Sequence, residues 1–204
     1  MAIDWTPHRF SGGALALDMA NTVVLRGDPR GFDRFAEAVE IARFAEAAAV
    51  HRADELGGRR MAVADAAAAK DGVVELREAI DSLFRAWAGR RQPPPGALPR
   101  LLRACAAALE GEDEAVFADA GDAAEAGRTG DAPIAFTAAV AKSALGLLCD
   151  DASARIRICA DCNWLFLDRS RNGSRVWCDM AVCGNRQKAR RHYGRRKAEE
   201  SRHG

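Results

Sequence analysis

The chain has 204 residues, which is enough for one large domain or two modest ones and for a core that needs no metal over its first three quarters. Hydrophobic residues make up 49% of it but aromatic residues only 6%, and alanine is abundant, so closely packed helices are favoured over an extensive sheet. The chain opens with no basic segment followed by an apolar one, and no run approaches the roughly 18 apolar residues of a membrane span. We therefore expect a cytoplasmic protein with no membrane partner.

The net charge of +1 conceals a marked asymmetry along the chain. Residues 155–204 contain 13 Lys and Arg against 5 Asp and Glu, a net charge of +8. Residues 1–154 contain 17 against 24, a net charge of −7. Such a division predicts a basic C-terminal part with a binding partner of its own.

The first quarter of the chain contains one ambiguous segment and one predicted helix. Residues 11–25 are compact and apolar, and they fit either a strand or a short helix. After a turn at 27–31, we expect a helix from Asp33, as its N-cap, to about Leu56. One side of that helix would consist of Phe32, Phe35, Val39 and Ala42.

Three further segments follow in the acidic part. A helix over 72–90 has one broad apolar face, and it can extend back through the alanine-rich residues 61–69. Beyond the proline-rich residues 92–96, another helix is defined by Leu98, Leu101, Leu102, Cys105 and Leu109. Residues 111–130 are acidic and weakly patterned, which is typical of a loop.

A last helix is expected before the basic part begins. Asp131 would cap it, Pro133 would lie in its first turn, and it would continue to about Asp151. Cys105 and Cys149 lie within apolar patterns, so we interpret both as small buried residues.

Four cysteines in the basic part have the spacing of a metal site. Cys159-x2-Cys162 is followed, fifteen residues later, by Cys178-x4-Cys183. Each short pair can hold one edge of a tetrahedron, and four thiolates leave no position for a catalytic water. In a reducing compartment metal ligands are favoured over two disulfides, and zinc over iron, although a four-thiolate tetrahedron can hold either metal.

The segments around the cysteines predict a knuckle, a hairpin and a helix. Residues 155–159 and 164–167 have the pattern of short strands, 171–174 contain the Asn-Gly of a tight turn, and 175–178 would return as a strand. A basic helix would begin near Asn185, and its end, from Arg195 onward, would fray. This combination is typical of a treble-clef-like or zinc-ribbon-like α+β finger that binds one structural Zn²⁺. We interpret the nearby His192 as part of the basic face rather than as a ligand.

Two motifs resemble known bacterial families. Cys-Asp-Met-Ala-Val-Cys-Gly-Asn-Arg-Gln-Lys-Ala, from Cys178, resembles the CGNR zinc-finger family over about 155–197, with the name-giving residues at 183–186. The segment Gly13-x-Leu-x-Leu-Asp-x-x-Asn-Thr22 resembles the opening of that family's usual partner, the ABATE domain, although Met-Ala at 19–20 replaces a bulkier pair. The resemblance implies a transcription regulator, sometimes described as stress-induced, with a zinc finger thought to bind DNA.

We therefore expect a mainly α protein with two parts. Residues 1–152 would form a mostly helical ABATE-like domain, and residues 153–204, called the finger below, would form a CGNR-type zinc finger with a basic C-terminal helix. Asp18, Asn21 and Thr22 match the ABATE motif, and they could contact a ligand. The favoured interpretation is structural: such polar side chains cap a helix or satisfy buried backbone groups.

The leading functional interpretation is a DNA-binding regulator whose finger presents its basic helix to duplex DNA. The predicted phosphate contacts are Arg175, Arg186, Lys188, Arg190, Arg191, Arg195, Arg196 and Lys197, with Arg169 and Arg171 extending the patch. A helix that is basic nearly all round suits phosphate contact better than base reading, and RNA is a variant of the same idea. The N-terminal domain is compatible with sensing a small effector.

Two other interpretations have different consequences. The basic finger could be a protein-interaction module that docks on an acidic surface, including the chain's own N-terminal part, or it could be only a solvated tail. The sequence contains no glycine-rich phosphate loop, no histidine-rich metal cluster and no nucleophile elbow. We therefore do not expect an enzyme.

Overall fold

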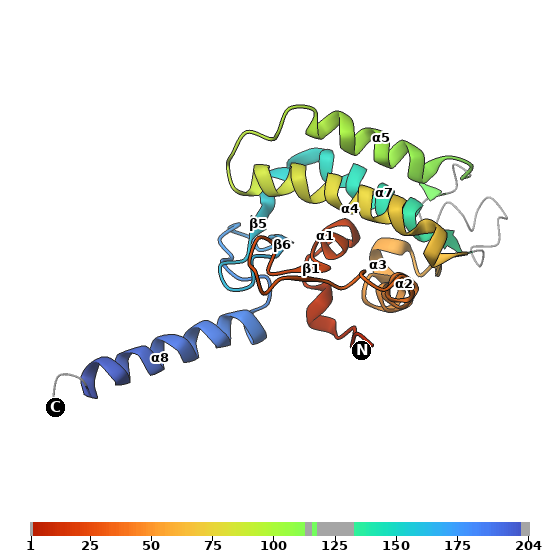
Figure 1. Cartoon of the computed structure of the whole chain (residues 1–204). Helices are drawn as coiled ribbons and strands as arrows, with labels where there is room; N and C mark the ends of the chain where they lie inside the picture. Colours follow the sequence, from red (N-terminus) through yellow and green to blue (C-terminus); the bar gives the residue numbers. More distant parts are fainter. Residues whose placement is uncertain (1, 113–115, 118–132, 201–204) are drawn as a thin grey trace.

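The computed structural model describes residues 2–112, 116–117 and 133–200. Its α-helices are α1 Leu15–Ala20, α2 Val39–His51, α3 Ala53–Leu56, α4 Ala66–Ala88, α5 Ala97–Leu109, α7 Phe136–Leu148 and α8 Asn185–Glu200 (Figure 1). Antiparallel pairs join β1 Val23–Val24 to β2 Phe32–Asp33 and β5 Ile156–Ile158 to β6 Leu165–Leu167; β3 Met61–Ala62 pairs in parallel with β4 Ile134–Ala135. Two 3-10 turns, η1 Pro7–Phe10 and η3 Asp150–Arg155, and a π turn, η4 Met180–Gly184, complete the order.

The predicted fold class is confirmed: a mostly helical N-terminal region precedes a small finger built from a β-hairpin, a helix and a four-cysteine cluster. None of the helices in the described ranges is long and apolar enough to cross a membrane.

Helix α4 is the central helix of the N-terminal region. Its predicted apolar face is buried, with Ile80 and Phe84 fully inaccessible, and it does extend back into the alanine-rich stretch. The Asp65 carboxylate caps it by accepting from the N–H groups of Ala67 and Ala68. Helices α1, α5 and α7 pack against α4, so the core lies between these four helices (Figure 1).

The ambiguous segment 11–25 forms a helix followed by a strand. All six residues of α1 are buried, and Val23–Val24 then pairs with Phe32–Asp33.

Two glycines before α1 let the backbone lie close to neighbouring groups. A Cβ on Gly12 would lie 2.6 Å from Oδ1 of Asp18, and Gly13, at φ +83°, faces the backbone of Leu167.

The helix predicted from Asp33 begins six residues later, at Val39. Asp33 belongs to β2, where its carboxylate binds both terminal nitrogens of Arg77 and accepts from the N–H of Phe35. This ion pair holds the segment as a strand and a turn. Of the side predicted for that helix, Phe35 is buried, but Phe32 and Val39 are half exposed.

Of four smaller expectations, two need correction, one is confirmed and one lies mostly outside the described residues. The helix near 131–151 comprises only Phe136–Leu148, because Ile134 pairs with Met61 in β4. The helix predicted over Leu98–Leu109 is confirmed as α5, in which Leu101 and Cys105 are buried and Leu98 and Leu102 are about two-fifths exposed. Helix α8 continues through Arg195 to Glu200. Most of the acidic segment 111–130, and Asp131, lie outside the described residues.

The predicted return strand Arg175–Cys178 is wrong, since the structure has no strand there. Strand β6 pairs instead with β5, in the register Ile156–Leu167 and Ile158–Leu165. In the described part of the chain, no ladder of backbone hydrogen bonds joins β6 to residues 175–178. The Asp168 carboxylate instead accepts from the N–H groups of Ser170 and Arg175 and so closes the turn between them, in which Gly173 has φ +57°.

The finger and the N-terminal region share a hydrophobic core. Ile156, Leu165 and Leu167 belong to the same buried cluster as α1, α4 and α7. Strand β6 contacts α1 and β5 contacts α4, whereas α8 extends away from the rest of the molecule to the C-terminus (Figure 1). The boundary at 152/153, as a limit between independently folding parts, stays a prediction.

Candidate metal centre and nucleic-acid interface

The four predicted cysteines come together in one cluster. The Sγ atoms of Cys159, Cys162, Cys178 and Cys183 all lie within 4.8 Å of one another. The Cys162–Cys178 and Cys178–Cys183 sulfur pairs are 3.6 and 3.8 Å apart. A tetrahedron with Zn–S bonds of about 2.3 Å has edges of about 3.8 Å, so the geometry fits one structural Zn²⁺.

The first cysteine pair lies in the loop of the β5–β6 hairpin. The N–H of Cys159 donates to the carbonyl of Trp164, and the N–H of Asn163 donates to the carbonyl of Cys159. Asn163 has φ +62°, a conformation that asparagine tolerates. The N–H of Ala160 donates to the carbonyl of Val176, which brings the second cysteine segment alongside.

The second cysteine pair lies around the start of the C-terminal helical segment. The Asp179 carboxylate accepts from the N–H groups of Ala181 and Val182, and its backbone carbonyl accepts from Cys183. Although burial alone would raise the pKa of Asp179, these bonds and His8 hold it below its usual value. Cys183 therefore lies in the first turn of a capped helical segment, where the dipole favours a thiolate.

The surroundings of the cluster favour a bound cation. Trp164, Phe166 and Trp177 pack around the sulfurs. Burial and the charge of Cys178 raise the pKa of the Cys183 thiol, so a cation bound among the sulfurs would favour its thiolate form. A divalent metal supplies that charge, and the four sulfurs complete its coordination.

A buried arginine of the N-terminal region lies next to this centre. Arg34 is 7% exposed, its guanidinium lies 5.2 Å from the Trp164 ring, and it donates to the carbonyl of Asn21 at 3.1 Å. Burial lowers its pKa to about 10, while the charge of Cys162 acts in the opposite direction. In the described ranges no carboxylate pairs with Arg34, so its charge complements the anionic metal–thiolate unit.

Asp161, inside the first cysteine pair, fastens the basic helix to the metal centre. Its side chain is fully inaccessible, and its carboxylate accepts from Arg186 and Arg190 at 2.7 Å each and from Gln187 at 3.1 Å. We call this arrangement the Asp161 clip. The clip fixes the direction in which α8 extends from the metal centre.

The predicted phosphate contacts differ in whether the described residues already bind them. Arg186 and Arg190 belong to the clip, and Arg175 donates to the carbonyl of Cys178. Lys188, Arg191 and Arg195 are exposed and have no polar partner within the described part of the chain; we call these three the basic stripe. Arg196 is also exposed, and the side chain of Lys197 lies outside the described residues.

The basic stripe lies opposite the clip. At 100° per residue, Lys188, Arg191 and Arg195 fall within about 60° of one another, on the far side of the helix from Arg186 and Arg190. The ring of His192 contacts that of Tyr193 edge-on, outside the cysteine cluster. A helix with no apolar side is stabilised mainly at its clipped end, and its outer surface is available to a partner.

The three ABATE-motif residues all make buried structural contacts. Asp18 accepts from the N–H of Gly12 at 2.7 Å and from Nε of Arg52 at 2.5 Å. Asn21 binds the backbone of Leu165, and Thr22 donates to the carbonyl of Met19. These contacts favour a structural role over direct ligand binding, and that assignment stays a proposal.

The sequence interpretation missed the residues that join the two parts. Nδ1 of His8 lies 2.9 Å from the Asp179 carboxylate, and its ring stacks on Trp164. Arg85 donates to the carbonyl of Asn163, and Leu167 donates to that of Gly12. The Asp161 clip within the finger was missed as well, although Asp161 carried a local signal, because it is an acidic residue between two zinc-ligand cysteines and precedes an arginine-rich helix.

The two remaining cysteines differ from each other. Cys105 is buried as predicted, and burial raises the pKa of its thiol to about 11. Cys149 is exposed, contrary to the prediction, because α7 ends at Leu148.

Comparison with known families agrees with both motifs. Residues 13–151 match the ABATE family model, described as "Putative stress-induced transcription regulator", and residues 155–196 match the CGNR zinc finger. Both descriptions name a regulator or a zinc finger, and neither names a catalytic activity. Searches of curated proteins and of solved structures found no match to this chain.

Proposed function

The chain belongs to the ABATE family and carries a CGNR zinc finger, and from this premise we propose that it binds duplex DNA through the basic stripe of α8. The observation that carries the proposal is the division of charge on this helix. Arg186 and Arg190 are committed to the Asp161 clip, whereas Lys188, Arg191 and Arg195 lie on the opposite face and have no polar partner among the described residues.

The arrangement suits binding to phosphates. Zinc and the clip together hold α8 rigidly at one end, so the stripe needs little ordering on binding. Three cations along two turns of helix can each displace a counterion from a phosphate, which makes affinity strongly dependent on salt. Phosphate contacts carry no base information, so we expect similar affinity for unrelated sequences.

The test is fluorescence anisotropy of the zinc-loaded full chain with a random-sequence duplex across a salt series. Replacing Lys188, Arg191 and Arg195 together by glutamine should flatten the log–log salt slope by about 2.7, at about 0.9 per phosphate. The matched control replaces Arg90, Arg91 and Arg103, three exposed cations of the helical region, and should leave the slope unchanged.

Two results would contradict the proposal. One is wild-type protein with no salt-dependent affinity for the duplex in low salt; the other is an equal loss of affinity in the stripe and control variants. Either would favour the alternative in which the basic finger docks on an acidic protein surface.

A further inference from the structure

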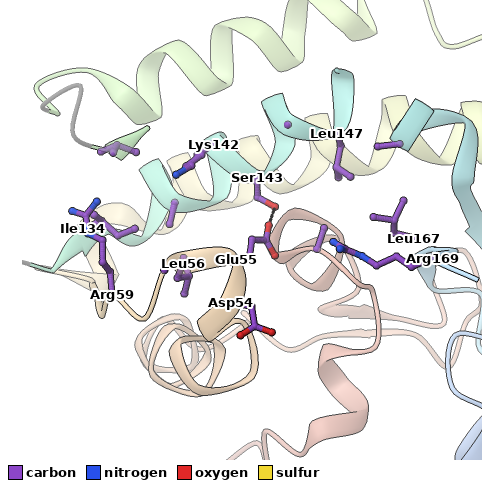
Figure 2. A pocket seen from close by; sticks show the side chains of 16 residues that line it. Asp54, Glu55, Leu56, Arg59, Ile134, Lys142, Ser143, Leu147, Leu167 and Arg169 are labelled. Atoms are coloured by element: carbon purple, nitrogen blue, oxygen red, sulfur yellow. Dashed lines mark hydrogen bonds between the residues drawn. The ribbon is translucent and has the colours of Figure 1, made fainter. Parts of the chain in front are cut away.

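A hollow between the N-terminal region and the finger has the features of a small-molecule site. Its volume is about 530 Å³, within the roughly 300–1,000 Å³ typical of ligand pockets. Helix α7, the α3 turn and the end of β6 form its walls (Figure 2). Leu167 and Arg169 of the finger lie at one end, and Lys142 lies toward the other (Figure 2).

The floor of the hollow is aliphatic. Leu56, Ile134, Ala139, Leu147 and Leu167 line it, and each is less than 10% exposed. Such a floor favours an apolar body that loses contact with water on entering. Among the described lining residues there is no aromatic side chain, which favours a flexible aliphatic chain over a planar ring.

The polar groups of the hollow leave one cation without a partner. Glu55 accepts hydrogen bonds from the N–H of Leu15 and the hydroxyl of Ser143, so its carboxylate is already occupied. Asp54 is exposed and points away from Lys142 (Figure 2). Lys142, half-buried on α7, makes no hydrogen bond or ion pair within the described ranges.

We propose that this hollow binds a small aliphatic carboxylic acid, with its carboxylate on the Lys142 ammonium and its chain along the aliphatic floor. A half-buried ammonium binds a carboxylate through charge-assisted hydrogen bonds, which are stronger where water is partly excluded. At the end of the hollow away from Lys142, Arg169 donates an N–H to the carbonyl of Gly13, which holds this side chain beside the glycine segment.

The position of the hollow couples this ligand to the finger. Leu167 and Arg169 both contact the glycine segment that precedes α1: the Leu167 N–H donates to the carbonyl of Gly12, and Arg169 donates to that of Gly13. A ligand that contacts Leu167 and Arg169 therefore favours the state in which β6 is docked, since it binds that state better than an undocked one. An effect on DNA affinity rests on the proposed function; binding of the acid does not.

The experiment is calorimetric titration of the zinc-loaded full chain with sodium octanoate, and with 1-octanol as the uncharged match. We expect saturable binding of octanoate. Lys142→Met keeps the aliphatic stem and should weaken octanoate at least about tenfold while leaving octanol unchanged. Arg103→Met, which removes an exposed cation on α5, should change neither.

A second variant tests the hollow without touching the charge. Gly146 lines the hollow, and a Cβ there would meet no atom within 4 Å outside its own helical turn, so the side chain in Gly146→Leu has room to enter the cavity. It should abolish binding of both compounds. The proposal is overturned if octanoate does not bind saturably below its micelle-forming concentration, or if Lys142→Met binds it as well as the wild type.

A final arm separates this proposal from the proposed function. Anisotropy with the random duplex is repeated with and without saturating octanoate. A changed DNA affinity in the wild type but not in Gly146→Leu supports the coupling, and an unchanged affinity despite octanoate binding refutes it. If the protein binds no DNA, the calorimetry still decides whether the acid is bound.

Discussion

The Asn21 side chain pairs with the backbone of Leu165 as a neighbouring strand would. Its Nδ2 donates to the Leu165 carbonyl and its Oδ1 accepts from the Leu165 N–H, both at 2.8 Å. Both residues are buried, and 144 positions separate them in the chain. An ABATE-motif residue thus holds the strand that follows the first zinc-ligand pair.

Asn21→Ala should destabilise the protein by roughly 2–6 kcal/mol, because it leaves two buried backbone groups without partners at about 1–3 kcal/mol each. Urea unfolding followed by circular dichroism measures the change. Asn172→Ala, in the exposed turn of the finger, is the matched control and should stay within about 0.5 kcal/mol of the wild type. An equal effect of the two substitutions would show that the Asn21–Leu165 pair contributes nothing specific.

How much the sequence could predict depended on the range of each interaction. The cysteine spacing and the apolar face of α4 are local patterns, and the structure agrees with both. The start of α2 depended on Arg77 binding Asp33 from 44 residues away, and Asn21 binds the backbone of strand β6 from 144 residues away. Long-range contacts of this kind override local propensity and leave no periodic signal.

The site shows the same division. Lys188, Arg191 and Arg195 could be placed together on one helical face by periodicity alone. Which face of α8 would bind the rest of the finger depended on Asp161, 25 to 29 residues earlier than Arg186 and Arg190. That contact requires the loop that carries Cys159 and Cys162 to be folded around the metal. The hollow beside Lys142 was invisible for a similar reason, because its walls come from α3, α7 and β6.

Removal of zinc should disorder the finger and also weaken the N-terminal region. Structural zinc contributes on the order of 10 kcal/mol of apparent binding free energy. Because Ile156, Leu165 and Leu167 belong to the shared core, a chelator should lower the melting temperature of the helical region while most of its far-ultraviolet helical signal persists at low temperature.

Two variants complete the zinc experiment. Cys149→Ser, an exposed cysteine outside the cluster, should bind one zinc per chain and melt like the wild type, whereas Cys178→Ser should lose the metal. Complete loss of the helical signal on adding the chelator would show that residues 1–152 cannot stay folded without the finger.

Asp161→Asn should release α8 while zinc stays bound. The substitution keeps the size of the side chain but removes the charge that holds Arg186 and Arg190, at a cost of roughly 1–3 kcal/mol. Hydrogen exchange should become faster in α8, and metal content should stay at one zinc per chain. Asp71→Asn, on the exposed side of α4, is the control; unchanged exchange in Asp161→Asn would mean that the clip does not restrain the helix.

The pH dependence of stability should carry a contribution from Asp18. Burial raises its pKa from 3.8 to about 7, although Arg52 and the Gly12 N–H act in the opposite direction. Between these two values the folded state binds more protons than the unfolded state, so the contribution of Asp18 to the free energy of unfolding falls as pH rises, by up to about 1.4 kcal/mol per unit. Above about pH 7 it should become constant.

Comparison with Asp18→Asn isolates this contribution, because every other group titrates in both proteins. The free energy of unfolding of the wild type, relative to the variant, should decrease from about pH 4 to about pH 7. Chemical denaturation at a series of pH values measures it. A difference that does not vary with pH would mean that Arg52 keeps Asp18 ionised throughout.

Arg190 and Arg191 are adjacent in sequence but should have different roles. Arg190 binds the Asp161 carboxylate at 2.7 Å, whereas Arg191 belongs to the basic stripe on the opposite face. Arg191→Ala should reduce the log–log salt slope for duplex DNA by about 0.9 and leave thermal stability unchanged, because it removes one phosphate contact. Arg190→Ala should instead lower protection of α8 against hydrogen exchange, since half of the clip is lost, and change the salt slope less.

Each variant is the control for the other, because the two remove the same charge from neighbouring positions, and both should retain zinc. Equal salt slopes in the two variants would mean that the two faces of α8 contribute equally to DNA binding. That result would contradict the assignment of the basic stripe as the contact surface.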